Sequence, residues 1–335
     1  MVNFNKYVEI GPATMTADAV ARGMVKAAER DKKIIAVLED MGFPGMAWFK
    51  KNAPERVVEC GIAEAGAAVV AAGLAAEGFT PVIYSFVFAA IGRAYNQIRQ
   101  SILVDRFNVK IIGREGAWGE TGISHNYVEG IAATRVMPNL VILSPADVVE
   151  SEKATVAMMQ YVGPVFLRLE ASPPPLKIFS EDYPFDIGKA YTIKDGKDAT
   201  IIATGYMVTE AISAAELLEK DGIDIRIVNM STLKPLDVDA VIEAAQTTGA
   251  IVTAENHSVI GGLGEAVGVT LAEYAPVPLV RVGIQDEFSQ SGKITKERDE
   301  LKIHFELDAK DLAVAVKECL AKKERLQAAG RKGSG

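Results

Sequence analysis

Continuous apolar runs alternate with amphipathic stretches along the first half of the chain. The run IIAVL at 34–38 has no polar residue on either face, which is typical of a strand buried in a parallel sheet. In 16–30, by contrast, Ala19, Val20, Met24 and Ala27 recur at helical spacing. The pattern predicts strands at 34–40, 56–59, 81–84, 109–112, 141–143 and 165–169, separated by helices at 16–30, 64–77, 92–103, 125–135 and 147–161.

A proline-rich stretch, 172–191, interrupts this alternation with four prolines in twenty residues. Proline donates no backbone hydrogen bond, so the stretch is excluded as a central strand and is expected to be an interdomain linker. We therefore expect two doubly wound α/β domains at 1–171 and 192–325, and a disordered tail at 326–335. The second domain is predicted to have strands at 199–203, 223–228, 250–254 and 279–282, and helices at 207–220, 237–246, 263–273 and 309–323.

The charge balance argues against a polyanionic partner. Lys and Arg number 36 against 44 Asp and Glu, which gives a net charge of −8, whereas nucleic acids and anionic membranes need a basic face. The two cysteines, Cys60 and Cys319, lie far apart and outside any metal or redox spacing. The start is unlike a signal peptide, and no apolar run reaches the roughly 20 residues of a membrane helix. We expect a cytoplasmic protein.

The sequence GIAEAG, from Gly61 to Gly66, places one carboxylate in an otherwise small and apolar run. Burying a charge costs several kcal/mol unless it is paired, hydrogen-bonded or protonated. Glu64 follows the strand at 56–59, and ligands of open parallel sheets bind at the carboxyl ends of the strands. Glu64 is therefore a candidate functional residue, although an acid favoured by the helix dipole explains it equally well.

Each of the three histidines has a functional and a structural explanation. His125 lies in a glycine-rich loop after the strand at 109–112, where an imidazole is placed for proton transfer or for binding a substrate oxygen. It fits a helix-capping role equally well. His257 precedes a glycine-rich turn that could cradle a phosphate, but such glycines more often serve close packing. His304 is expected to be structural or at the surface.

Aromatic and basic residues also follow the strands. Phe86 and Phe88 could stack on a planar ring, although aromatic residues at strand ends more often belong to the core. Arg114 and Arg168 could bind an anion, but a single arginine is usually a surface residue or an ion-pair partner. Dinucleotide-binding, P-loop, serine-hydrolase and zinc motifs are missing, which disfavours those four chemistries.

Five motifs, taken together and in order, resemble the C-terminal half of a transketolase. They are GIAEAG, IYSFVF with GRAYNQIR, GETGISH, SPAD and AENHSVIGGLGEA, and they most closely resemble the small subunit of split, two-gene transketolases. The resemblance extends over nearly the whole chain. It implies a thiamine-diphosphate pyrimidine-binding domain, a transketolase C-terminal domain that does not contact the cofactor, and transfer of a two-carbon ketol unit from a ketose to an aldehyde.

The resemblance also implies roles for individual residues. Glu64 would hydrogen-bond the aminopyrimidine ring and favour the imino tautomer that removes the proton from carbon 2 of the thiazolium. Phe86 or Phe88 would pack on the pyrimidine, and Asp40 would lie near the thiazolium. His125 would hydrogen-bond substrate hydroxyls.

The G-D-G motif with which the family holds the diphosphate through Mg²⁺ or Ca²⁺ is missing. The Asp-Gly pairs here, at 195–196 and 221–222, lie near the linker and at the end of a helix. The resemblance therefore implies that a large subunit carries the metal and the diphosphate, in a heterotetramer of two large and two small subunits. Three alternatives stay open: a deoxyxylulose-phosphate-synthase-like carboligase, the beta subunit of a 2-oxo acid dehydrogenase, and a non-catalytic paralogue.

Departures from the family pattern concern the substrate. Thr121 replaces an aspartate that reads an acceptor hydroxyl, and Met15 stands where a phosphate-binding arginine is usual. Leu169 or Ala171 occupies the position of the family's last phosphate-binding arginine, and Arg168 is its nearest substitute. The substrate contacts are thus expected from Arg114, Thr121 and Arg168, and the acceptor is expected to be an unphosphorylated, sulfonated or otherwise unusual aldehyde.

Overall fold

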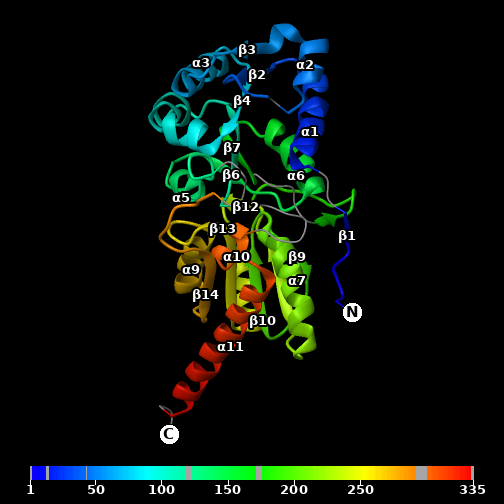
Figure 1. Ribbon diagram of the computed structural model, residues 1–335, viewed down its shortest axis with the longest axis vertical. Coiled ribbons are helices and arrows are strands. Elements are labelled where there is room, and N and C mark those ends of the chain that lie inside the picture. Colours follow the sequence, from blue (N-terminus) through cyan, green and yellow to red (C-terminus); the bar gives the residue numbers. More distant parts are fainter. Residues whose placement is uncertain are drawn as a thin grey trace.

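The chain folds into two α/β units stacked along the long axis of the molecule (Figure 1). The computed structural model describes residues 2–12, 15–42, 44–117, 122–170, 176–291 and 300–332. Each unit has a central, mostly parallel sheet with helices on both faces. The expected fold class, two doubly wound α/β domains in series, is confirmed.

The first sheet has seven strands in the described residues, in the order β12-β6-β7-β5-β4-β2-β3. Strands β2 to β7 run parallel, as their continuous apolar sequences predict, because helical crossovers cover both faces of such a sheet. The six parallel strands are β2 Ile34–Leu38, β3 Val57–Glu59, β4 Thr80–Phe86, β5 Lys110–Glu115, β6 Val141–Leu143 and β7 Val165–Glu170.

Helices cover both faces of this sheet. They are α1 Thr16–Arg30, α2 Met46–Asn52, α3 Glu64–Ala76, α4 Tyr95–Gln97, α5 Gly130–Arg135 and α6 Val148–Gln160, with a 3-10 turn at Pro54–Arg56 and π-helical segments at Phe88–Arg93 and Ile98–Leu103. The alternation along β2 shows how the faces divide. Ile34, Ala36 and Leu38 pack with α1 and α6, whereas Ile35 and Val37 point the opposite way and pack with α3.

The second sheet has five strands in the described residues, in the order β14-β13-β10-β11-β9. Its strands are β9 Tyr191–Lys194, β10 Ala199–Ala203, β11 Ile225–Asn229, β13 Ile251–Ser258 and β14 Leu279–Ile284. All are parallel except β9, which pairs antiparallel with β11 at one edge. The helices of this unit are α7 Met207–Lys220, α8 Val238–Thr248, α9 Leu263–Tyr274, α10 Glu300–His304 and α11 Ala309–Lys332.

Two pairings join segments far apart in the sequence. Strand β12, Thr232–Lys234, comes from the second unit but pairs antiparallel with β6, so it completes the edge of the first sheet. Strand β1, Val8–Pro12, pairs with β8, Leu176–Phe179. The proline-rich stretch therefore contains an ordered strand, β8, which we did not expect, and the Phe179 ring stacks on Tyr183 in the core.

Other departures from the expected elements are local. The helix expected at 92–103 begins at Phe88 and is largely π-helical, and the one expected from His125 begins at Gly130. The last helix continues to Lys332, through part of the expected disordered tail. Among the described residues, none of the helices has the length and apolar content needed to traverse a membrane.

Candidate active site

The carboxylate of Glu59 links the loops that follow β2 and β3. Asp40 follows β2 with a φ of 54°, a left-handed conformation that is uncommon for a residue other than glycine. Its backbone N–H donates to Glu59 Oε1 at 2.9 Å, and the backbone N–H of Gly61 donates to the same oxygen at 2.9 Å. Glu59 thereby fixes the loop that carries Asp40 against the loop that leads to Glu64.

Glu64 is the first residue of α3, and its side chain is 12% exposed. Its Oε1 accepts a hydrogen bond from Arg93 Nη1 at 2.6 Å. The mostly buried carboxylate is thus compensated by a guanidinium as well as by the amino end of the helix dipole. Arg93, to which sequence analysis assigned no role, lies in the motif GRAYNQIR at the end of a π-helical segment.

Three rings gather beside Glu64. The rings of Phe86 and Phe88 are stacked with centroids 5.9 Å apart. The imidazole of His125 meets both edge-on, at 4.8 Å from Phe86 and 4.7 Å from Phe88. The guanidinium of Arg93 lies over Phe88 at 5.1 Å, which connects the rings to Glu64, and that of Arg114 lies over Phe86 at 5.4 Å.

The structure thus brings together five of the residues singled out from the sequence, which come from four separate segments of the chain: Glu64, Phe86, Phe88, Arg114 and His125. Asp40 lies at the end of the adjoining strand β2. Such a set of an acid, stacked rings and an imidazole can hold a planar, hydrogen-bonding heterocycle and move a proton at its edge. Thr121 lies outside the described residues.

Glu39, immediately before Asp40, is a buried acid without a partner. It is 4% exposed, and no described residue donates a hydrogen bond to either of its carboxyl oxygens. The pKa of Glu39 is raised to about 6, mostly by burial and in smaller part by the negative charges of Glu64 and Glu59, while the hydroxyl of Ser85 opposes the shift.

Arg168 is not available to a substrate, so its expected role is corrected. Its side chain is fully buried, forms ion pairs with Glu115 and with Glu170 (3.1 Å), and donates to the backbone carbonyl of Asn256 at 2.6 Å. Its Nε, Nη1 and Nη2 atoms all donate to protein acceptors. Arg168 holds the two units together instead, because Glu115 and Glu170 end strands of the first sheet and Asn256 belongs to β13 of the second.

The amide of Asn256 extends this network. Its Nδ2 donates to Glu170 Oε2 at 2.6 Å, and its Oδ1 accepts from the backbone N–H of Ala117 at 2.9 Å. Residue Ala117 lies just after β5, on the path toward His125. The buried network therefore anchors the start of the loop that carries the imidazole.

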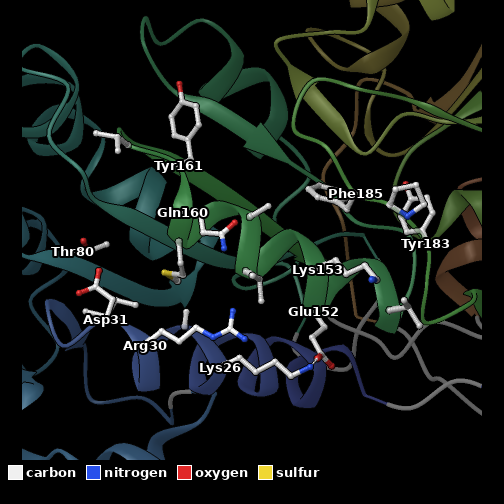
Figure 2. Close-up of a pocket in the computed structure, with 18 of the residues that line it drawn as sticks. Lys26, Arg30, Asp31, Thr80, Glu152, Lys153, Gln160, Tyr161, Tyr183 and Phe185 are labelled. Atoms are coloured by element: carbon white, nitrogen blue, oxygen red, sulfur yellow. Dashed lines mark hydrogen bonds and ion pairs between the residues drawn. The ribbon is translucent and has the colours of Figure 1, made fainter.

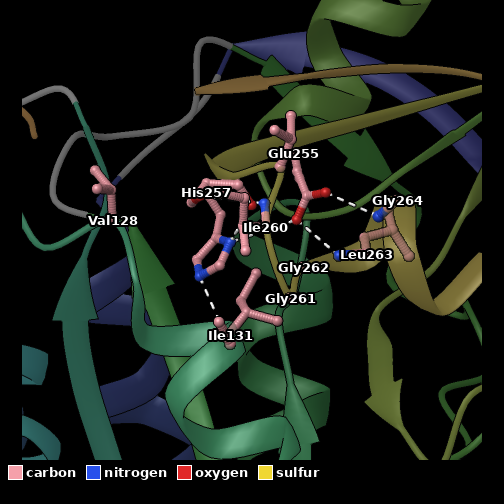
Figure 3. A network of polar contacts seen from close by, with 12 residues as sticks. Val128, Ile131, Glu255, His257, Ile260, Gly261, Gly262, Leu263 and Gly264 are labelled. Atoms are coloured by element: carbon pink, nitrogen blue, oxygen red, sulfur yellow. Dashed lines mark hydrogen bonds and ion pairs between the residues drawn. The ribbon is translucent and has the colours of Figure 1, made fainter. Parts of the chain in front are cut away.

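The glycine-rich turn after His257 does not form a phosphate cradle (Figure 3). The carboxylate of Glu255 accepts the backbone N–H groups of Leu263 at 2.7 Å and Gly264 at 2.8 Å, which a phosphate would otherwise need. A Cβ atom at Gly262 would lie 1.9 Å from Glu255 Oε2, so a side chain here would displace the Glu255 carboxylate. His257 Nε2 accepts from the backbone N–H of Ala132 at 3.2 Å, which supports the structural explanation of this residue.

A pocket of about 800 Å³ lies elsewhere, between α1, α6 and the segment 181–185 (Figure 2). It is lined by Ile34 and Thr80, the first residues of β2 and β4, and so opens at the amino ends of the strands. None of the site residues lines it, and we do not assign it to the reaction. Within the described ranges, no group of three or more His, Cys, Asp or Glu side chains could hold a metal ion.

Comparisons with known proteins agree with this architecture. Residues 13–173 match the transketolase pyrimidine binding domain, and residues 188–311 match the transketolase C-terminal domain. The chain is 39% identical over 303 residues to the 6-deoxy-6-sulfo-D-fructose transketolase subunit SqwH of Clostridium sp. (strain MSTE9), covering 90% of this chain and 92% of that protein. It is 36% identical to an apulose-4-phosphate transketolase subunit of Phocaeicola vulgatus, covering 89% and 95% respectively.

A solved structure described as a split gene transketolase, inactive beta4 tetramer, superposes with a TM-score of 0.84 at 38% identity, covering 93% of this chain and 100% of that chain. The fold and the two domain matches define a protein of the class of transferases and related thiamine-dependent enzymes. The chain belongs to the transketolase family, as the small subunit of a split transketolase-type enzyme. The resemblance inferred from the motifs is confirmed.

Proposed function

We propose that this chain, with a large subunit, forms a thiamine-diphosphate-dependent transketolase that transfers a two-carbon ketol unit from a ketose to an aldehyde. The observation that carries the proposal is the position of the Glu64 carboxylate beside the stacked Phe86 and Phe88 rings and the His125 imidazole. The acid fits a ring nitrogen of an aminopyrimidine, and the aromatic rings fit its face.

The residues of this chain would divide the work as follows. Thiamine diphosphate, when bound, supplies the carbanion chemistry. Glu64 would hold a proton at the pyrimidine ring nitrogen, Phe86 or Phe88 would orient the ring, and Asp40 would lie near the thiazolium. His125 would hydrogen-bond a substrate hydroxyl. For this, Arg93 must share or release Glu64 Oε1, which is feasible because the Arg93 side chain is 57% exposed.

A partner subunit is expected to supply the metal and the diphosphate site. The described residues offer no metal cluster, and the outward face of α3 directly after Glu64 is apolar. Val69 and Val70 on this face are 49% and 39% exposed, and Ile62 just before the helix is 73% exposed, so burying them against another chain would be favourable. We therefore propose an interface at α3 and a heterotetramer of two large and two small subunits. The inactive state of the related beta4 tetramer supports the need for a second kind of subunit.

For the substrate, Arg114 is the arginine that remains as a candidate once Arg168 is excluded. Its guanidinium lies over the Phe86 ring, which the His125 imidazole also contacts. A guanidinium there suits the anionic or hydroxyl-rich end of a sugar. The similarity to a subunit of a 6-deoxy-6-sulfo-D-fructose transketolase supports a sulfonated substrate, whereas the similarity to a subunit of an apulose-4-phosphate transketolase supports a phosphorylated one.

Reconstitution tests the proposal. The chain alone, and the chain with its large subunit, thiamine diphosphate and Mg²⁺, are assayed with pairs of ketoses and aldehydes. We expect turnover only in the complex, and a decrease of at least about 100-fold in kcat for Glu64→Gln with assembly preserved.

Several outcomes would contradict the proposal. Turnover restricted to pyruvate with an aldehyde would favour the carboligase, and turnover of a 2-oxo acid with lipoamide would favour the dehydrogenase subunit. A complete complex without any turnover would favour a non-catalytic paralogue. Robust activity of the single chain would refute the shared site.

A further inference from the structure

His125 belongs to a loop of the first unit whose two ends are tied together. The backbone N–H of Gly116 donates to the carbonyl of Tyr127 at 3.0 Å, which closes the base of the loop. The backbone N–H of His125 donates to the carbonyl of Gly122 at 3.0 Å, which forms the turn that carries the imidazole. These two bonds shape the loop but do not attach it to the rest of the molecule.

Residues of the second unit attach the loop. Ala117 is held through both of its backbone polar groups, because its N–H donates to Asn256 Oδ1 at 2.9 Å and its carbonyl accepts from Ser289 Oγ at 2.6 Å. On the other side of the imidazole, Asn126 Nδ2 donates to the backbone carbonyl of Gln290 at 3.2 Å. The second unit therefore holds the loop both before and after the imidazole.

The segment 285–291, which follows β14, packs closely on this loop. Ser289 and Asn126 are only 2% and 3% exposed, so water competes little for their hydrogen bonds. Gly122 has a φ of 75°, and a Cβ atom at this residue would lie 2.8 Å from Ser291 Oγ. The turn that carries the imidazole and the segment of the second unit are thus in direct contact.

The two units are already joined elsewhere. Strand β12 completes the edge of the first sheet, and Arg168 connects Glu170 to the backbone carbonyl of Asn256. Those links fasten strands of one unit to the other, whereas the Ser289 hydroxyl fastens a loop that carries a candidate site residue. Its consequence is therefore expected at the site.

We propose that Ser289 is a positioning residue, through which the second unit fixes the His125 imidazole against the two phenyl rings and so sets the affinity for the sugar substrate. The imidazole meets Phe86 at 4.8 Å and Phe88 at 4.7 Å between ring centroids, both edge-on. The inference rests on the proposed function, because a substrate hydroxyl is the group that His125 would bind. A hydrogen bond weakens steeply when its donor and acceptor move out of line, so a displaced loop would bind the sugar less tightly.

The first measurement uses the chain alone and does not depend on its activity. The three histidines give three sets of imidazole NMR signals, and those of His125 are assigned by their absence in His125→Gln. The neighbouring phenyl rings shift these signals, because a ring current acts according to distance and orientation. In Ser289→Ala, which removes one hydroxyl and should fold normally by circular dichroism, we expect the His125 signals to move toward their positions in the unfolded chain.

Ser151→Ala is the matched control. Ser151 is fully buried in α6, and its Oγ donates to the backbone carbonyl of Asp147 at 2.6 Å, the same distance as for Ser289. The control therefore removes the same kind of hydrogen bond from another part of the first unit. It should leave the His125 signals in place.

The second measurement uses the reconstituted complex with a ketose and an aldehyde. Ser289→Ala should raise KM for the sugar by about tenfold, while kcat stays within about twofold, because a contact made equally in the bound substrate and in the transition state affects KM alone. Ser151→Ala should change neither constant. In the His125→Gln background, Ser289→Ala should have no further effect on KM, because its influence passes through the imidazole.

The outcomes separate the inference from the proposed function. Unmoved His125 signals in Ser289→Ala, or an equal displacement in Ser151→Ala, overturn the inference even if the complex is an active transketolase. An effect of Ser289→Ala on KM that persists in full without the imidazole also overturns it. A wild-type complex that transfers no ketol unit overturns the proposed function, and the role of Ser289 in substrate affinity with it, even if the His125 signals move in the chain alone.

Discussion

At the residue scale, three charged side chains differ in how the cost of removing a charge from water is offset. Arg168 is buried with two carboxylates and a carbonyl, Glu64 is paired with a half-exposed guanidinium, and Glu39 has no partner among the described residues. A buried charge that is fully satisfied by its neighbours has no capacity left for a ligand. This is why Arg168 is structural, whereas the acids at the edge of β2 and α3 remain candidates for function.

The first prediction concerns Arg168. Arg168→Met should lower the free energy of unfolding by about 3 to 5 kcal/mol, because Glu115 and Glu170 would be left buried without their cation. The matched control is Lys317→Met in the exposed pair with Asp221 (2.7 Å), where the loss should stay below about 1 kcal/mol. Urea denaturation measures both, and equal losses in the two variants would contradict the assignment.

Lys110 leads to a prediction about pH. The side chain is fully buried, and its Nζ donates to the carbonyls of Tyr161 and Gly163, both at 2.7 Å, which a neutral amine with two hydrogens can satisfy. Burial lowers the pKa of Lys110 to about 7, whereas the unfolded chain keeps the ordinary value of 10.5. The unfolded state therefore binds more protons between these values.

The contribution of Lys110 to stability should accordingly rise from about pH 7 to about pH 10.5 and stay constant below pH 7. The difference in unfolding free energy between the wild type and Lys110→Met, followed across this range, isolates this contribution from other groups. A difference that does not change with pH, or that decreases as pH rises, would show that Lys110 is charged in the folded protein.

At the element scale, α3 carries both the candidate acid and the face that we propose as an interface. The Ala- and Gly-rich sequence leaves no charged residue on the outward side until Glu77, although part of this side is exposed in the single chain. A helix that is apolar all round is normally buried, so its outer face needs a cover. Because this face adjoins Glu64, a partner subunit packed on it would also adjoin the candidate site.

Val69→Glu tests this role of α3. Because Val69 is 49% exposed in the single chain, the variant should fold normally by circular dichroism. It should weaken association with the large subunit by at least about tenfold, since a carboxylate would be buried in the interface. Val162→Glu, at a residue that is 86% exposed outside α3, is the control. Unchanged association of Val69→Glu in analytical ultracentrifugation would place the interface elsewhere.

Elements with a local sequence pattern could be predicted, and elements defined by contacts with distant segments could not. Apolar runs identified strands such as Ile34–Leu38 and Ala199–Ala203, because burial on both faces leaves a local pattern. The short edge strands β9 and β12 carry no such pattern and are defined by pairing with distant segments. The π-helical form of Phe88–Arg93 likewise depends on packing rather than on periodicity.

For the site, sequence identified Glu64, Phe86, Phe88 and His125 through motifs, and the structure brings them together. It misjudged Arg168, because the partners Glu115 and Asn256 are 53 and 88 residues away and leave no mark near the arginine. Sequence reasoning did not identify Arg93 or Glu39 as site residues. Arg93 is recognised only from its hydrogen bond to Glu64 in the folded chain, and Glu39 only from its burial without a hydrogen-bond donor among the described residues.

At the scale of the whole molecule, the two units share structure across their boundary. Strand β12 from the second unit completes the first sheet, and the Arg168 network fastens β7 to β13. Neither unit therefore keeps all its backbone and charge partners when the other unfolds.

Thermal unfolding should accordingly be a single cooperative transition rather than two. Calorimetry with a van't Hoff to calorimetric enthalpy ratio near unity would support this. Thr232→Pro, at a residue that pairs with β6, should weaken this edge and split or broaden the transition. Two resolved transitions in the wild-type chain would show that the units are thermodynamically independent.

The shared edge also orders events during synthesis. When β6 has left the ribosome, its pairing strand lies far downstream, at Thr232–Lys234, and is still untranslated. The β6 edge of the first sheet therefore stays unpaired, in a form that favours pairing with other nascent chains, until the first part of the second unit has emerged. The first sheet can therefore be completed only after translation has continued into the second unit.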